Sequence, residues 1–256
     1  MTNRVSKRIV VALISLWLVG CTTAGGTRPT TYIAPDPKAA DINVQLGLSY
    51  MQRGNYEIAL EKLEKALQQN PNLPSAHNAI ALLFQRLGES DKAEKHFKES
   101  VLRDPRYSEA QNNYGVFLCE QKHYEAAVQR FLEATKNPLY ESKAQALENA
   151  GTCANRIPDQ TLAEHYFLQA LQLNPHLSKS LLQMAKLRFL NVEYEQALSY
   201  IQRYQQVANW VPSALYTAIQ IGNKLNDQDA VSSYALLLRG KFPDSDEAQL
   251  VKRGEY

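Results

Sequence analysis

Reactive side chains are few in this chain of 256 residues, which has five histidines and three cysteines. The histidines are scattered along the sequence, and no H-E-x-x-H, C-x-x-C, G-x-S-x-G or P-loop pattern is present. We therefore expect no catalytic residue, no metal site, no cofactor and no small-molecule substrate. An enzyme with a cryptic site is the weaker alternative, because it requires a cleft of converging titratable groups. The remaining chemistry belongs to Cys21, Cys119 and Cys153.

The first of these cysteines ends an apolar segment near the start of the chain. Arg4, Lys7 and Arg8 form a basic tip, and residues 9–20 are mostly apolar. A basic tip followed by a short apolar run is the layout of a secretory signal. The run is too short for a membrane-spanning helix, which needs about 20 apolar residues.

The segment Leu18-Val19-Gly20-Cys21 resembles a bacterial lipobox, with leucine three positions before the cysteine and a small residue directly before it. The resemblance implies that residues 1–20 are a signal peptide, that the Cys21 thiol is lipidated and that the new N-terminus is acylated. Thr22, where aspartate would retain a lipoprotein at the inner membrane, favours the periplasmic side of a Gram-negative outer membrane. The alternatives are an ordinary secretory signal with a chance cysteine, and a cytoplasmic protein with a buried N-terminal helix.

The charge of the processed chain is close to neutral. Removing residues 1–20 takes away three of the 28 lysines and arginines and none of the 26 acidic residues, which leaves a net charge of −1. The sequence has no basic patch of the kind that would indicate a nucleic-acid partner. Residues 21–39 are rich in Gly, Pro, Thr and Ala, so we expect a flexible tether between Cys21 and a folded domain that begins at residue 40.

The rest of the chain repeats with a period of 34 residues. Prolines at positions 71 and 105 are 34 apart, and Pro175 lies 70 further on. Aligning them predicts six units, at residues 40–73, 74–107, 108–143, 144–177, 178–211 and 212–245, followed by a C-terminal tail, residues 246–256. Each unit has two apolar stretches of helical spacing, separated by a turn.

At certain positions of the unit, the side chains of successive units have similar sizes. We number these positions as slots, with the proline at slot 32. Slots 8 and 20 hold small residues such as Gly47 and Ala59, and slot 24 holds large ones such as Phe97. Small residues let two helices cross closely, and the large one fills the space beyond. Unit six departs from the pattern, with Ile219 at slot 8 and Val231 at slot 20.

This arrangement resembles the tetratricopeptide repeat over about 205 of the 256 residues. The resemblance implies an all-α fold, a right-handed superhelical solenoid of about six helix pairs whose first helices line a concave groove. An irregular helical bundle is the alternative.

The groove positions of the family define a candidate partner-binding set. It consists of Val44, Leu48, Met51, Asn78, Leu82, Gln85 and Asn112. We expect the three apolar residues of unit one to start a binding site for another protein, because contiguous exposed apolar surface usually marks one. The two asparagines would bond to the partner's backbone. The alternative is that the linker or a nearby loop covers the apolar residues.

Cys119 and Cys153 fall on the first helices of adjacent units. Such helices lie side by side, and an even number of cysteines in an oxidising compartment favours a disulfide. Two separate buried thiols are the alternative.

The complete layout resembles the type IV pilus biogenesis lipoproteins, the pilotins of the secretin pore. The resemblance rests on the lipidated cysteine, the tether, the repeats and the stretches "GLSYMQRGNYEIALEKLEKAL", "NNYGVFLCEQKHYEAAVQRF" and "ENAGTCA". It implies a scaffold that binds the secretin subunit, carries it to the outer membrane and promotes its multimerisation. The alternative is an envelope adaptor for peptidoglycan hydrolases or synthases.

Overall fold

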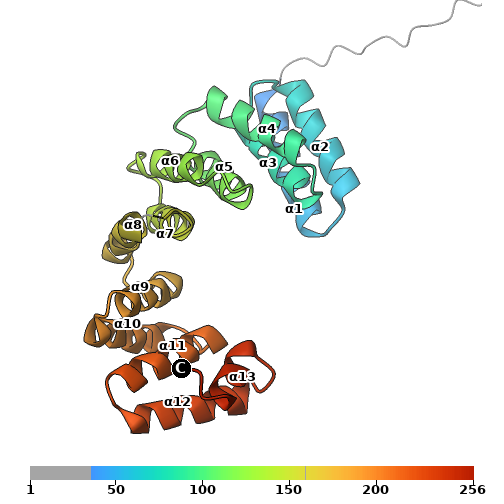
Figure 1. Cartoon of the computed structure of the whole chain (residues 1–256). Helices are drawn as coiled ribbons and strands as arrows, with labels where there is room; N and C mark the ends of the chain where they lie inside the picture. The colour runs from blue at the N-terminus through green and yellow to red at the C-terminus, as the bar shows by residue number, and fades with distance from the viewer. Residues whose placement is uncertain (1–35, 159) are drawn as a thin grey trace, which may run out of the picture. The chain divides into compact units, whose positions relative to one another are not determined.

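The computed structural model describes residues 36–158 and 160–256, and these form thirteen helices and no strand. The helices follow one another in antiparallel pairs, and each pair packs on the next (Figure 1). The first twelve helices make the six predicted pairs. Their bounds are α1 (Pro37–Gln52), α2 (Tyr56–Gln69), α3 (Pro74–Arg86), α4 (Ser90–Arg103), α5 (Ser108–Glu120), α6 (Tyr124–Thr135), α7 (Lys143–Ala154), α8 (Gln160–Leu173), α9 (Ser178–Leu190), α10 (Tyr194–Val207), α11 (Pro212–Lys224) and α12 (Gln228–Lys241). The all-α superhelical repeat fold expected from the sequence is confirmed.

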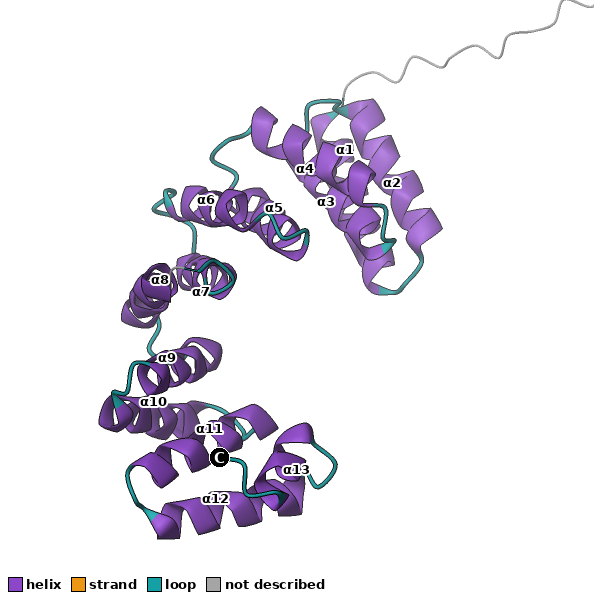
Figure 2. Ribbon diagram, in the orientation of Figure 1, coloured by secondary structure: helices purple, strands orange, loops and turns teal. Residues whose placement is uncertain are grey.

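Two boundaries differ from the sequence-based expectation. Helix α1 begins at Pro37, inside the expected tether, because Asp36 accepts a hydrogen bond from the backbone N–H of Ala39 and proline suits the first turn of a helix. The expected C-terminal tail contains a further helix, α13 (Asp246–Lys252), whose N-terminus is closed by the Ser245 hydroxyl. Figure 2 shows these helices and the short loops between them.

The contact within each pair is set by side-chain size. In unit one, a Cβ on Gly47 would come within 2.5 Å of Cγ of Leu63, so only glycine allows α1 and α2 to cross at this distance. The alanines at slot 20 and the large residues at slot 24 in units one to five are almost completely buried. The small and large positions read from the sequence therefore form the interior of the stack.

Unit six achieves the same contact with the sizes exchanged. Ile219 is fully buried at slot 8, where other units have glycine or alanine, and Ala235 occupies slot 24, where other units have a large residue. Volume-conserving exchanges of this kind keep a core filled. Helix α13 then covers the outer side of this unit with Ala248 and Val251, which pack in one apolar cluster with Ile219.

The turns also repeat. The residue two positions after the first helix takes positive φ in five units, at Gly54 (+78°), Gly88 (+75°), Lys122 (+65°), Val192 (+66°) and Asn226 (+58°). Between units, the side chain of an Asn or Asp accepts a backbone N–H two residues later, as Asp104 does from Arg106. These Asx turns end the second helix and, with the proline, start the next unit.

Candidate functional site

The predicted apolar stripe of unit one lies mostly inside the protein. Val44 is 3% and Met51 is 4% exposed, so the expectation that they line an open groove is wrong. Both residues are three or four positions from Gly47, which faces Leu63 of α2, and residues so spaced share one face of a helix. Leu48 is half-buried and packs against the same core.

A different face of α1 is exposed and apolar. Ile42 is 60% and Leu46 is 42% exposed, and they are one turn apart. They occupy slots 3 and 7 of unit one, and we call them the open face. At the same slots, units two to six bury every residue: Ala76, Ile80, Ala110, Tyr114, Ala146, Ala150, Ser180, Met184, Ala214 and Ala218.

The second helix of each unit packs on the first helix of the next unit and supplies part of this cover. Tyr114 on α5, for example, stacks on Phe97 of α4 with ring centroids 5.6 Å apart. Within residues 36–256, no unit precedes α1, so Ile42 and Leu46 have no such cover. The slot alignment contained this signal, because slots 3 and 7 are apolar or small in every unit.

The two asparagines connect repeat units to each other. Asn78, which is buried, accepts a hydrogen bond from Nδ2 of Asn113 at 3.2 Å. Asn112, which is half-buried, accepts one from Nδ2 of Asn149 at 3.1 Å. The expectation that they bond a partner's backbone is wrong for Asn78, whose side chain is enclosed. The amides instead fix the spacing of successive first helices.

Leu82 and Gln85 are half-buried on α3. They line a shallow cleft of about 400 Å³ together with Arg86, Val116 and Glu120. The side-chain amide of Gln85 donates to Glu120 at 2.7 Å. This cleft is open to a ligand from solvent.

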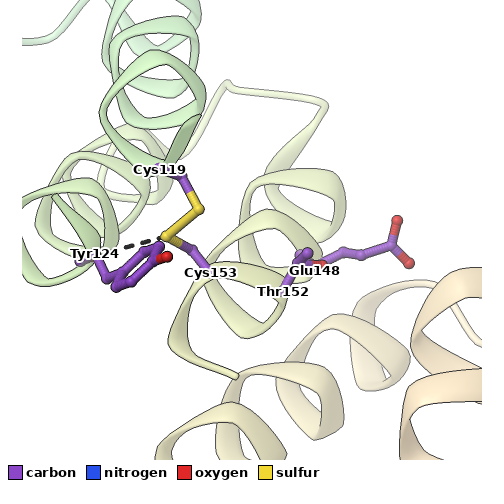
Figure 3. Close-up of a disulfide and its surroundings, with 5 residues drawn as sticks. All are labelled: Cys119, Tyr124, Glu148, Thr152 and Cys153. Carbon is purple, nitrogen blue, oxygen red and sulfur yellow. Dashed lines mark hydrogen bonds between the residues drawn. A yellow bond between two sulfur atoms is a disulfide. The ribbon is translucent and has the colours of Figure 1, made fainter. Parts of the chain in front are cut away.

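A disulfide joins Cys119 on α5 to Cys153 on α7, with Cα atoms 5.9 Å apart (Figure 3). The Sγ atom of Cys153 lies 3.9 Å from the carbonyl oxygen of Tyr124, which starts α6. The bond links units three and four across the two-residue insertion at their junction. Cys21, the expected lipid attachment point, lies outside the described residues.

Glu148 on α7 is a buried carboxylate at slot 5 of unit four, the slot that Val44 occupies in unit one. It is 4% exposed and accepts hydrogen bonds from Ser180, from the backbone N–H at 2.9 Å and from the hydroxyl at 2.7 Å. Ser180 stands in the first turn of α9, where an acidic side chain is stabilised by the unsatisfied N–H groups of the helix. Glu148 therefore joins unit four to unit five and is not available to a partner.

Two histidines face each other in unit two. Nδ1 of His77 on α3 lies 3.1 Å from Nδ1 of His96 on α4. Burial lowers the pKa of both rings, and with the neighbouring His77 and Lys95 it lowers the pKa of His96 to about 4. Both rings are thus neutral at pH 7, which lets one donate and the other accept.

Two searches of the described residues gave negative findings. Among residues 36–158 and 160–256, no cluster of three or more His, Cys, Asp or Glu side chains could hold a metal ion. In the same part of the chain, no helix has the length and apolarity needed to cross a membrane.

Comparison with known proteins connects this repeat fold to pilus assembly. The tetratricopeptide-repeat families match residues 47–88 and 78–140. The type IV pilus assembly protein PilF of Pseudomonas aeruginosa is 35% identical over 95% of this chain and 96% of its own length.

Two solved structures have the same fold. The structure of Pseudomonas aeruginosa PilF matches with a TM-score of 0.78, 35% identity, and coverage of 85% of this chain and 98% of the other. PilW, a type IV pilus biogenesis factor, matches with a TM-score of 0.74, 28% identity, and coverage of 85% and 100%. The chain belongs to the tetratricopeptide-repeat family of type IV pilus biogenesis proteins that includes PilF and PilW.

Proposed function

We propose that this protein is a lipid-anchored pilotin for the type IV pilus secretin. In this role it binds the secretin subunit, brings it to the outer membrane and promotes its multimerisation, so that pili can pass. Family membership and the Leu18–Cys21 segment support the proposal. The open face of Ile42 and Leu46 is the observation on which the binding role depends.

The repeat stack itself indicates what kind of partner fits the open face. At every later unit, slots 3 and 7 are buried on a first helix that packs against the second helix of the unit before. A partner helix with apolar residues one turn apart can take that position on α1, as amphipathic helices do in hydrophobic grooves. The secretin subunit would supply that helix, and α1 would receive it as it would receive a preceding unit.

The lipid on Cys21 would supply the location. Each buried CH₂ contributes about 0.8 kcal/mol, and a single acyl chain anchors a protein only marginally. Several chains on one residue hold it at the membrane. Residues 22–35 then separate the anchor from α1, so the open face lies on the part of the described domain nearest to the lipid along the sequence.

The test replaces the open face and leaves the core intact. We expect Ile42→Asp/Leu46→Asp to reduce secretin multimers in the outer-membrane fraction about tenfold or more, because it places two charges in an apolar contact. The matched control is Leu102→Asp/Leu139→Asp, which changes two exposed leucines away from α1 and should leave multimers unchanged. Leu48 is a poorer choice, because it packs against the core.

Three results would contradict the proposal. Secretin multimers that persist in the Ile42→Asp/Leu46→Asp variant would remove the open face from the binding role. Multimers that remain in the outer membrane after Cys21→Ala would show that the lipid anchor is not needed to bring the secretin there. Co-purification of peptidoglycan hydrolases or synthases in place of a secretin would assign the protein to envelope adaptors instead.

A further inference from the structure

The two histidines that face each other in unit two have no counterpart in the other units. His77 occupies slot 4, on the first helix, and His96 occupies slot 23, on the second. The other units hold different pairs at these slots: Asn43 with Lys62, Gln111 with Arg130, Leu147 with Tyr166, Leu181 with Tyr200 and Leu215 with Tyr234. Leucine and tyrosine at these slots satisfy the fold in three units, so the fold does not require the imidazoles of unit two.

Hydrogen bonding leaves one ring nitrogen of His77 free to bind a metal ion. Nε2 of His77 lies 3.3 Å from the carbonyl oxygen of Pro71, which can only accept a hydrogen bond, so Nε2 carries the proton. Nδ1 of His77 then has a lone pair and lies 3.1 Å from Nδ1 of His96, which donates the hydrogen bond between the rings. Metal-bound histidines typically donate their other N–H to a carbonyl in this way, which fixes the tautomer and the ring orientation.

The separation of the two Nδ1 atoms suits a single ion. A Zn–N bond measures about 2.0–2.1 Å, so two of them enclosing an angle of about 100° span about 3.1 Å. The Nδ1 atoms of His77 and His96 are 3.1 Å apart. The ring centroids are 5.3 Å apart, so the rings approach each other through these nitrogens and are not stacked face to face. Small rotations of the two rings bring both Nδ1 lone pairs onto one ion.

The surroundings hold both rings neutral and leave the site open to water. Burial lowers the pKa of both rings, so they are neutral at pH 7, which is the form that binds a metal ion. The charges of Lys95 and Arg103 also lower the pKa of the rings and that of Glu99 raises it, so two cations oppose a bound metal ion and one anion favours it. His96 is half-buried, so water can complete the coordination.

The pair provides two protein ligands and no more. In the part of the chain that the structure describes, no third His, Cys, Asp or Glu side chain joins them in a metal-binding cluster. Closed structural zinc sites have four protein ligands. A site with two ligands therefore keeps open positions and releases its ion more readily.

We propose that His77 and His96 bind one divalent transition-metal ion of the Zn²⁺ class through their Nδ1 atoms, with water in the remaining positions. Imidazole is a ligand that suits Zn²⁺, Cu²⁺ and Ni²⁺. On binding, Nδ1 of His96 gives up its proton and Nε2 of the same ring takes one from solvent, so both rings stay neutral. The ion ties α3 to α4, and this role is independent of the open face.

The test titrates Zn²⁺ into the full, untagged chain by calorimetry, with Cys21→Ala in every sample because that thiol lies outside the disulfide. We expect one ion per chain, and about tenfold or more weaker binding in His96→Gln and in His77→Leu/His96→Tyr, which lack a ligand. The double variant adopts the pair of units four to six and should fold as wild type. The matched control, His165→Gln/His176→Gln, removes two exposed histidines and should bind as wild type.

A second measurement locates the ion. As Zn²⁺ is added, the ¹⁵N resonances of Nδ1 in His77 and His96 should move together, while those of His165 and His176 stay in place. No binding to the wild-type pair, equal affinity in His96→Gln, or movement of the other histidines without this pair would overturn the proposal. The open-face variant should leave Zn²⁺ binding unchanged, so the metal site and the open face can fail separately.

Discussion

The two ends of the repeat stack are finished differently. At the C-terminal end, α13 places Ala248 and Val251 over unit six, and both are buried. At the N-terminal end, Ile42 and Leu46 remain exposed, although the same slots are buried in each of the five following units. A stacked repeat cannot bury its terminal surface by itself, so solenoids need end caps.

This difference separates a terminal surface that the chain buries itself from one that stays exposed to other molecules. The capped end serves the fold, because the chain itself supplies the cover. The open end has the same construction as an internal junction but lacks, within the described residues, a helix to complete it. The C-terminal end therefore contributes to stability, and the proposed binding of a partner uses the N-terminal end.

The largest expected effect comes from a charge placed at each end. Ala248→Asp puts a carboxylate at a fully buried position and should lower the free energy of unfolding by about 3 kcal/mol or more. Leu46→Asp changes a residue that is already 42% exposed and should cost less than about 1 kcal/mol. Urea unfolding followed by circular dichroism measures both. Equal losses in the free energy of unfolding for the two variants would contradict the difference between the two ends.

A second test asks whether the ends behave independently. Cys119→Ser/Cys153→Ser opens a loop of 34 residues and should cost about 3–4 kcal/mol, because the bond restricts the unfolded chain. Hydrogen exchange should quicken in α5 to α8 and hardly change in α1 and α13, since each repeat contacts only its neighbours. Faster exchange along the whole chain would show that the ends are coupled through the middle.

The smallest expected effect is a dependence on pH that is confined to the N-terminal units. The pKa of His96 is about 4 in the folded protein and that of His77 is also lowered, whereas an unfolded histidine titrates near 6.5. The unfolded chain therefore binds more protons below pH 6.5, and stability falls as the pH drops from 6.5 towards 4. Solvent screening of the half-buried His96 ring limits the loss to about 1 kcal/mol.

The control for this prediction is His77→Phe/His96→Phe, which keeps two packed rings and removes their titration. The variant should lose this dependence on pH between 6.5 and 4. Hydrogen exchange at α3 and α4 should report the change in the wild type. An unchanged pH profile in the variant would place the sensitivity elsewhere.

The fold could be predicted from the sequence because the repeat is a pattern of small and large side chains at fixed positions. Small residues such as Ala59 and large ones such as Phe97 recur at fixed slots, and each has one steric role at the helix crossing. The 34-residue step also predicted the turns. Unit six was read as irregular because exchanging Ile219 and Ala235 hides the pattern while preserving the filled volume.

The binding surface was harder to predict, because one repeat position can have two environments. Val44, at slot 5 of unit one, was assigned to the groove, but its spacing from Gly47 turns it towards α2. Glu148, at the same slot of unit four, is drawn inwards by the first turn of α9. Ile42 and Leu46 resemble core residues in every respect except that they belong to the first unit. Their exposure depends on whether another helix packs against α1. The residue types at slots 3 and 7 carry no information about that.

The disulfide also limits how far the chain can be stretched along its length. A pull on the chain cannot lengthen the 34-residue loop between Cys119 and Cys153, which would otherwise yield roughly 115 Å of extension. Tension would bypass α6 and nearly all of α7 through the covalent bond. The middle of the stack would thus keep its length under load, while the repeats on either side absorb the stretch.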